Sequence, residues 1–550
     1  MPADTIPAET VRASAASTTA ELPGRRLTAP AVFGHGLTRG IALGAVALLV
    51  LASLWLRVRT IHDHYWIDEG LSVGIASHPL SAIPGLMRQD GSPPLYYLLL
   101  HLWISWRGAS EIATHELSLI FALLTIPAAY WAGSSLFDRR TGLICALLAA
   151  GASYLTQYGQ ETRMYTLLAL VALIAVASFL HAFAFRRRRY IPVFVASLTA
   201  ALYTHNWALF LGLMTAVAFL VCVRERPLER RELWRDGALA FGGVAVLYAP
   251  WIPTVLYQAR HTGAPWDLPP VIWSLTQGLY SLVGGRGAAV ALLLAGGSGL
   301  FALQQRGLLR LRGGESKPLG LTVACLILLA FGTLLIAWAY SKTTPAWANR
   351  YLAVIVGPLI LLFGLGLARA GRLGLVALVL TCCFWVLDPL PKSRDWKSNV
   401  ASVAARLRPH LGSDTLVLST QPEQVPVIAY YLPGVSRFGT PLGPVADPRV
   451  VDWRDALGRL RRSSVRSVLV PMLRSLAPGQ RVLLVVPAQQ QKEPLWAKLI
   501  ARYTTQWQSA LAHDRSLKQV AVTSSKRFAV VSPDSHGSGL PVSATLYVHR

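Results

Sequence analysis

The chain has 550 residues, of which 53% are hydrophobic and only 14% are charged. A typical soluble domain has about 25% charged residues, so this composition excludes a disordered chain, a disulfide-rich scaffold and an ordinary cytosolic enzyme. The mean hydropathy of +0.43 predicts many membrane spans. The net charge is +25, and many of the Arg residues fall in short clusters between apolar runs. Membrane orientation explains that charge more simply than nucleic acid does, and we expect no nucleic acid partner.

The apolar runs predict a polytopic α-helical membrane protein. Residues 1–38 are rich in Ala, Thr, Pro and Glu, which is typical of a disordered cytosolic N-terminus. A transmembrane helix needs about 20 apolar residues. Eleven runs within residues 39–390 come close to this length: 40–56, 117–136, 142–158, 164–185, 190–205, 207–223, 237–256, 287–305, 319–340, 351–369 and 373–390. The shorter run 94–106 follows two prolines, and we expect an outer-face juxtamembrane helix there instead of a span.

Basic clusters between the spans predict the orientation, because cytoplasmic loops carry an excess of Lys and Arg. The clusters are Arg139-Arg140, Arg186–Arg189, Arg224 to Arg235, Arg306 to Lys317, and Arg369 with Arg372. Eleven spans and a cytosolic N-terminus place all five in the cytosol, whereas a twelfth span at 94–106 would put Arg186–Arg189 outside. We therefore expect a multi-pass protein of the inner or plasma membrane with an extracytoplasmic C-terminus.

The segment 391–550 differs in character and predicts a small extracytoplasmic α/β domain. Short runs of the β type lie at 415–418, 467–471, 482–486 and 528–531, with helical patterns at 399–411 and 496–512.

The first outer loop contains an acidic pair, Asp68-Glu69, directly after Trp66-Ile67. Ionisable groups at a membrane border are costly and tend to mark functional sites, and a carboxylate held there suits a general base. Acids also favour the first turn of a helix. The residues alone leave these two interpretations equally open.

Three further groups of polar residues border spans on the same face. They are Tyr158 to Tyr165, which includes Gln160, Glu161 and Arg163; Tyr203 to Trp207, which includes His205; and Lys342 to Tyr351, which includes Arg350. An aromatic belt with a local ion pair would explain the first group, a structural hydrogen bond the second, and snorkelling of cations the third. Function is favoured for the first group, because so short a loop leaves little room for solvating its charges. It is also favoured for the third group, because the positive-inside rule should deplete cations on this face.

Some motifs are missing from the sequence. It has no Gly-rich phosphate loop and no dinucleotide fingerprint, which argues against a nucleotide-driven pump. Its predicted spans carry almost no charges at mid-depth, where ion-coupled transporters usually keep them.

Taken in order, the motifs resemble the GT-C membrane glycosyltransferases of the protein mannosyltransferase type, glycosyltransferase family 39. The lipid A aminoarabinose transferases are more distant relatives. The resemblance covers about residues 40–390 and rests on Asp68-Glu69, Gly91 to Tyr97, Gln160-Glu161 with Arg163 and Tyr165, Tyr203 with His205, Pro250-Trp251 with Pro253, and Arg350-Tyr351. Two positions depart from it: His115-Glu116 stands where relatives often have an Arg, and Ser92 where the aminoarabinose transferases have a Lys.

The resemblance implies a polyprenyl-phosphate sugar as donor and inverting transfer on the non-cytosolic face. It implies Asp68 as general base with Glu69 in support. Arg163, Lys342, Arg350 and Tyr351 are the candidates for binding the lipid phosphate, and the predicted supporting residues are His115, Tyr158, Gln160, Glu161, Tyr165 and His205.

Several alternatives stay open at this point. The acceptor could be a protein, a lipid or a glycan, and membrane lipids are further expected partners. A divalent metal bridging Asp68-Glu69 and the phosphate is compatible with the acids, although the sequence shows no clear ligand set. A transporter or flippase of a lipid-linked substrate would use the same basic loops without the acidic pair, and a non-catalytic receptor would bind through the C-terminal domain.

Overall fold

A computed structural model describes residues 38–309, 317–387, 396–489, 493–524 and 541–550. The predicted N-terminal segment therefore lies outside the described residues except for Thr38. The same holds for the predicted domain boundary at residue 391 and for the β-type run at 528–531.

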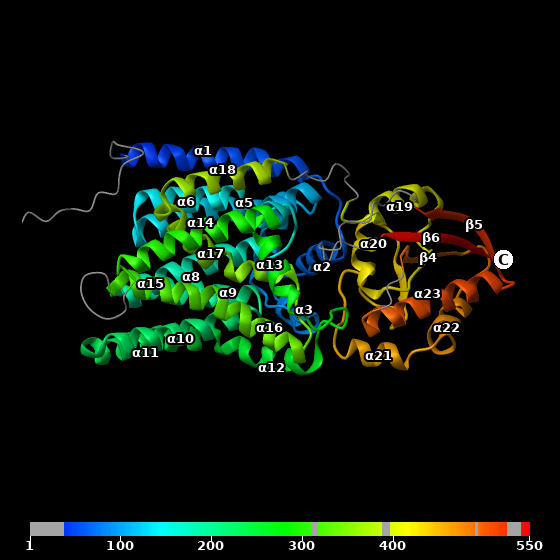
Figure 1. Cartoon of the computed structure of the whole chain (residues 1–550). Helices are drawn as coiled ribbons and strands as arrows, with labels where there is room; N and C mark the ends of the chain where they lie inside the picture. The colour runs from blue at the N-terminus through cyan, green and yellow to red at the C-terminus, as the bar shows by residue number, and fades with distance from the viewer. Residues whose placement is uncertain (1–37, 310–316, 388–395, 490–492, 525–540) are drawn as a thin grey trace, which may run out of the picture.

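The N-terminal two thirds form a helical bundle (Figure 1). Its helices are α1 (Arg39–Arg57), α2 (Ile67–Ala76), α3 (Ile83–Asp90), α4 (Leu95–Arg107), α5 (Glu111–Leu136), α6 (Arg139–Gly151), α7 (Ser153–Tyr158), α8 (Tyr165–Phe179), α9 (Ile191–Thr204), α10 (Ala208–Glu225), α11 (Arg230–Tyr248), α12 (Ile252–His261), α13 (Trp273–Val283), α14 (Arg286–Gln305), α15 (Lys317–Ile327), α16 (Thr333–Thr343), α17 (Ala353–Arg369) and α18 (Gly371–Leu387). A π-helical turn extends α8 to Ala184, and another joins α15 to α16. The apolar segments of α8 and α17 are almost fully buried, so these two helices form the centre of the bundle.

Within the described residues, eight helices are long and apolar enough to cross a membrane, some of them made of two consecutive elements. They account for eight of the eleven predicted spans. The other three predicted ranges contain the shorter helices α6, α9 and α18, of 13, 14 and 17 residues. These pack against α5, α8 and α14 in the same bundle. The polytopic helical fold class is confirmed, and the run at 94–106 forms the single 13-residue helix α4.

Ion pairs join the basic clusters to one another. Arg186 binds Glu229 and Asp236, and Arg369 binds Asp138. Figure 1 shows the turn between α10 and α11 at the end of the bundle away from the C-terminal domain. The eleven-span topology and its orientation stay predictions.

The C-terminal domain is an α/β sandwich. Its six-stranded sheet has the order β3-β2-β1-β4-β6-β5, with β1 parallel to β2 and β4 and the other neighbours antiparallel. The strands are β1 (Leu416–Ser419), β2 (Arg437–Thr440), β3 (Gly443–Val445), β4 (Arg481–Pro487), β5 (Leu517–Ser524) and β6 (Val542–His549), and the helices are α19 (Val400–Leu407), α20 (Val425–Tyr431), α21 (Ala456–Arg462), α22 (Val470–Arg474) and α23 (Leu495–His513).

Helices cover both faces of this sheet (Figure 1). Along β4, Leu483 and Val485 belong to the core formed with α19 and α20, whereas Leu484 and Val486 belong to the core that includes α23. A strand buried on both faces is apolar at every position, which explains why the run 482–486 predicts this strand correctly.

The predicted strand at 467–471 is wrong, because this run is helical. Ser464 and Ser467 form a reciprocal capping box that starts the turn, and Pro471 stands in the first turn of α22, where a missing N–H costs nothing. The helix-capping interactions therefore outweigh the preference of the β-branched residues in this segment for a strand.

The C-terminal domain docks on α2, as the adjacent positions of α2 and α20 in Figure 1 show. Gly70 and Gly74 lie four residues apart on one face of α2. A Cβ atom on Gly70 would come within 2.7 Å of the backbone of Val427, and one on Gly74 would overlap the carbonyl of Arg449. Only glycine therefore allows this close contact between the bundle and the domain.

Candidate active site

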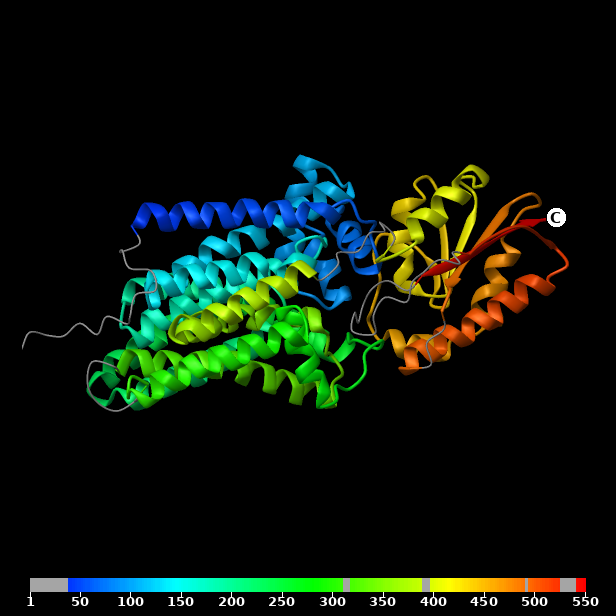
Figure 2. The ribbon, with the colours of Figure 1, turned by 45° about the horizontal axis from the view of Figure 1, so that its top comes forward.

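The acidic pair lies in the first turn of α2, at the end of the bundle that faces the C-terminal domain (Figure 2). Consecutive residues of a helix point about 100° apart, so the two carboxylates have different surroundings. The Glu69 side chain is fully buried, whereas that of Asp68 is 19% exposed.

Glu69 is held by four hydrogen bonds. Its Oε1 accepts from the Thr162 backbone N–H at 2.9 Å and lies 2.6 Å from Nε2 of His115. Its Oε2 accepts from Nζ of Lys397 at 2.9 Å and from the Trp66 backbone N–H at 3.3 Å. Burial alone would raise the pKa of Glu69, but the charge of Lys397 and the imidazole of His115 outweigh burial and lower it. Glu69 is therefore a buried, ionised anchor, and its bond to the Trp66 N–H also caps α2.

Asp68 lies between two buried arginines. Its Oδ2 is 3.8 Å from Nη2 of Arg163 and 3.8 Å from Nε of Arg350. These separations are too long for hydrogen bonds, so the pairs are purely electrostatic. The structure thus brings together three predicted residues that are far apart in the sequence.

Neighbouring groups fix both arginines. Arg163 donates to the Asp68 carbonyl oxygen, to Oγ of Ser72 at 2.9 Å and to the hydroxyl of Tyr97 at 3.3 Å. The Tyr154 hydroxyl donates to the carbonyl oxygen of Arg350. Nε of Arg163 is buried and has no hydrogen-bond partner in the described part of the chain. The site therefore has an unused cationic donor beside Asp68.

Aromatic rings surround the arginines. Tyr165 lies 5.0 Å from Tyr158 and 6.4 Å from Tyr351, and Tyr351 lies 4.7 Å from His205, all between ring centroids. The guanidinium of Arg350 lies 5.3 Å from the ring centre of Tyr351. These predicted residues form an apolar wall that strengthens the electrostatic interactions inside it.

Gln160 and Glu161 lie behind the acidic pair. The Gln160 side chain donates to the Thr156 carbonyl oxygen, and the backbone carbonyl oxygen of Gln160 accepts from Nζ of Lys397. Burial raises the pKa of Glu161 to about 8; the charge of Lys397 opposes this rise, and those of Glu69 and Asp68 add to it. Oε2 of Glu161 has no partner among the described residues.

Comparisons with known proteins agree with this arrangement. A family model described as dolichyl-phosphate-mannose-protein mannosyltransferase matches residues 91–252. The fold is similar to that of ArnT from Cupriavidus metallidurans, at a TM-score of 0.61 and 14% identity over 92% of this chain and 98% of that one. The undecaprenyl phosphate-bound form of ArnT gives a TM-score of 0.59 at the same identity and coverage.

The chain has the GT-C fold. The resemblance predicted from the motifs is confirmed at this level. The oligosaccharyltransferase of Archaeoglobus fulgidus, in its apo form, is a further match at a TM-score of 0.50 and 11% identity, over 72% of this chain and 64% of that one. No curated protein sequence matches the chain.

One predicted phosphate-binding residue lies apart from the cluster in this GT-C protein. Lys342 is exposed in the last turn of α16, and its Nζ lies 4.8 Å from the ring centre of Trp338. The cations beside Asp68 are Arg163 and Arg350.

Lys397, which comes from the C-terminal domain, is a site residue that was not predicted from the sequence. It is buried with Ser398 and Asn399, and Trp396 beside it donates to Asp63. Its sequence signal is weak, because it is one of three basic residues in a short polar run after the last apolar segment. The pairing with Glu69 depends on how the domain docks, which no local pattern reveals.

The acids of this GT-C protein do not fit a metal ion that bridges Asp68 and Glu69. Both oxygens of Glu69 already accept hydrogen bonds, one of them from the Lys397 ammonium group. Among the described residues, no three His, Cys, Asp or Glu side chains gather in a way that could hold a metal ion.

Proposed function

We propose that this GT-C protein is an inverting glycosyltransferase that moves a sugar from a polyprenyl-phosphate donor to an acceptor hydroxyl at the outer face of the cell membrane. The observation that carries the proposal is the position of Asp68 between two buried arginines at the end of an apolar bundle. The family match and the fold shared with ArnT, which has been crystallised with undecaprenyl phosphate, support it.

In this proposal the arginines bind the donor phosphate. Arg163 and Arg350 lie within 4 Å of Asp68, and a phosphate oxygen would provide an acceptor for the unpartnered Nε of Arg163. Arg binds phosphate through a rigid fork of donors. The two cations then stabilise the negative charge that grows on the leaving phosphate.

Asp68 acts as the general base. The acceptor oxygen attacks the anomeric carbon from the side opposite the phosphate, and its proton passes to the Asp68 carboxylate. The bond from the anomeric carbon to the phosphate oxygen breaks, which releases polyprenyl phosphate and inverts the anomeric configuration. Glu69, ionised and fixed by His115 and Lys397, holds the first turn of α2 in place.

Labelled-sugar transfer by the purified full-length protein in lipid nanodiscs tests this function. Removing a general base costs about 10²–10⁴-fold in rate, so Asp68→Asn should lower turnover by that factor while donor binding persists. Asp414→Asn, at an exposed turn of the C-terminal domain, is the control and should be fully active. Wild-type turnover in a folded, donor-binding Asp68→Asn protein would refute Asp68 as the general base. A wild-type protein that binds donor but transfers no sugar would refute the glycosyltransferase proposal and favour a transporter.

A further inference from the structure

A crevice opens at the carboxyl edge of the C-terminal sheet. From β1 the chain passes through α20 to β2 on one side, while β4 lies on the other side of β1. In open α/β sheets, ligands bind at such a topological switch point. The residues that follow β1 and those at the end of β4 meet there.

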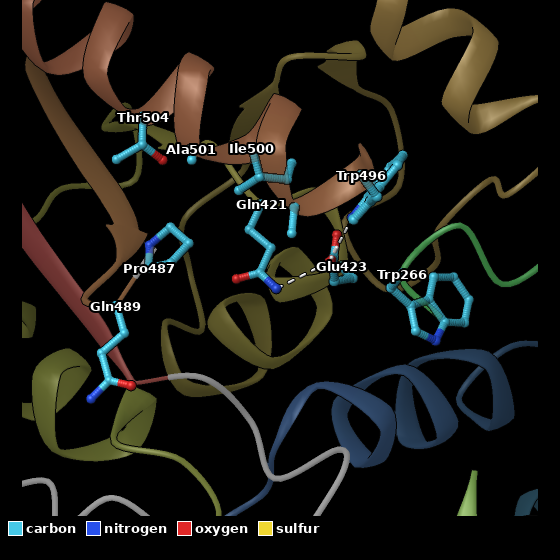
Figure 3. A pocket seen from close by; sticks show the side chains of 10 residues that line it. Trp266, Gln421, Glu423, Pro487, Gln489, Trp496, Ile500, Ala501 and Thr504 are labelled. Atoms are coloured by element: carbon cyan, nitrogen blue, oxygen red, sulfur yellow. Dashed lines mark hydrogen bonds between the residues drawn. The ribbon is translucent and has the colours of Figure 1, made fainter. Parts of the chain in front are cut away.

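The crevice is lined by these two segments, by the first turns of α23 and by one residue of the bundle (Figure 3). Gln421 and Glu423 follow β1, Pro487 ends β4, Trp496 begins α23, and Trp266 comes from the loop after α12. The space between them is partly open to solvent.

Two hydrogen-bond acceptors in the crevice lack donors. Oε1 of Glu423 accepts from Nε2 of Gln421 and from Nε1 of Trp496, both at 3.0 Å (Figure 3). Oε2 of Glu423 and Oε1 of Gln421 are buried and have no partner in the described part of the chain. The two side chains are only 7% and 5% exposed. The Gln421 amide cannot turn round without setting its oxygen against the carboxylate, so both free acceptors are fixed.

Two indoles, those of Trp266 and Trp496, form part of the lining of the crevice. Trp266 lies 4.4 Å from Trp453, which lies 5.5 Å from Trp496, between ring centroids. None of the ten lining residues is Lys, Arg or His, and the single charged group is the Glu423 carboxyl. A phosphate or another anion would find no counter-charge among these ten residues. A ligand with hydroxyl donors and flat C–H faces, as in a neutral sugar ring, matches both features.

The crevice is close to the candidate active site. Glu423 lies in the short turn directly before α20, and α2, which carries Asp68, packs against both the turn and α20. Burial raises the pKa of Glu423, and the charge of Asp68 adds to the rise. A ligand held by Gln421 and Glu423 would therefore lie on the side of the domain that faces Asp68.

We propose that this crevice is the acceptor subsite and that it binds a neutral sugar unit of a glycan-bearing acceptor. Gln421 and Glu423 accept hydrogen bonds from its hydroxyls, and the indoles of Trp266 and Trp496 cover its C–H faces. This inference rests on the proposed glycosyl transfer and names the chemical class of the acceptor.

Saccharide binding to the full-length protein in nanodiscs, measured without donor, tests the inference. The probes are neutral gluco-, manno-, galacto- and arabino-oligosaccharides, and the readout is saturation-transfer NMR with titration to a Kd. At least one series should bind. Trp266→Ala, at a half-buried loop position, should raise its Kd about tenfold, as truncation of an aromatic anchor does. Trp273→Ala is the matched control, because that indole is 69% exposed outside the crevice, and its Kd should stay within about twofold of the wild type.

Glu423→Gln provides a second variant that keeps the shape of the side chain, and it should also weaken binding. Any of three results would overturn the inference. These are failure of every oligosaccharide to bind, equal affinities in Trp266→Ala and the wild type, and competition by a Ser/Thr peptide alone. These measurements need no turnover. If the protein binds no saccharide but Asp68→Asn still abolishes sugar transfer, the acceptor-subsite inference is wrong and the proposed function stands. If the protein binds saccharide but transfers no sugar, the proposed function is wrong.

Discussion

The ammonium group of Lys397 lies 2.9 Å from Oε2 of Glu69, and both side chains are buried. One partner belongs to the C-terminal domain and the other to α2 of the bundle. The same ammonium group donates to the carbonyl oxygen of Gln160. This ion pair links the domain to the carboxylate next to the proposed base.

Lys397→Met should strongly destabilise the protein. Removing one partner of a buried pair leaves an uncompensated charge, which costs about 3–5 kcal/mol, here on Glu69. Thermal unfolding in nanodiscs, followed by intrinsic fluorescence, measures the loss. The double variant Glu69→Gln with Lys397→Met removes both charges and should recover part of the stability. Additive losses in the double variant would show that the two residues are not coupled.

Arg350→Ala should raise the KM for the polyprenyl-phosphate sugar and also lower kcat, because the cation acts on a phosphate whose charge grows in the transition state. Arg350→Lys should restore activity only in part, since Lys lacks the planar fork. Lys342→Ala, outside the cluster around Asp68, serves as the comparison and should have a smaller effect. Steady-state kinetics at varied donor concentration measure both variants. A larger loss in Lys342→Ala than in Arg350→Ala would show that the phosphate binds at α16 instead.

Gly74→Ala should separate the C-terminal domain from α2, because the added methyl group would overlap the Arg449 carbonyl. Gly70→Ala should act in the same direction through the Val427 backbone. Gly85→Ala, in α3, has open space around its Cβ position, so it should be neutral or slightly stabilising. Limited proteolysis and Tm report the difference. Equal behaviour of the three variants would refute the close docking.

Stability should fall as the pH rises between about 4.5 and 8, through Glu161. Its pKa rises from 4.5 when free to about 8 in the folded protein, so the folded state binds more protons than the unfolded state over this window. Glu161→Gln mimics the protonated form and should flatten this part of the profile. The measurement is Tm against pH for both proteins, and parallel curves would show that Glu161 is already ionised in the folded state.

A reporter enzyme fused after Arg550 tests the orientation. Eleven spans and a cytosolic N-terminus place this end outside the cytosol, so alkaline phosphatase should be active there and green fluorescent protein dark. The reverse pattern would reject the eleven-span topology and the outer-face site together.

The parts of the fold and of the candidate site that depend on local sequence could be predicted, whereas those that depend on domain docking could not. Apolar runs predict the helices because a bilayer demands about 20 apolar residues from each span, and the costly polar groups at their ends predict Asp68, Arg163 and Arg350. Lys397 could not be found in this way, since its pairing depends on two glycines of α2 that let the domain approach. The helical run at 467–471 was mistaken for a strand because Val and Leu suit both structures, and capping by Ser464 decides between them.

The burial of Lys397 against Glu69 also bears on biosynthesis. A ribosome completes all eighteen helices of the bundle before it reaches Lys397, so the nascent bundle holds an acidic pair without its buried cation. The site gains its final charge balance only when the last domain has been made and has docked. A chain that ends prematurely after α18 would leave Glu69 buried without the Lys397 ammonium group.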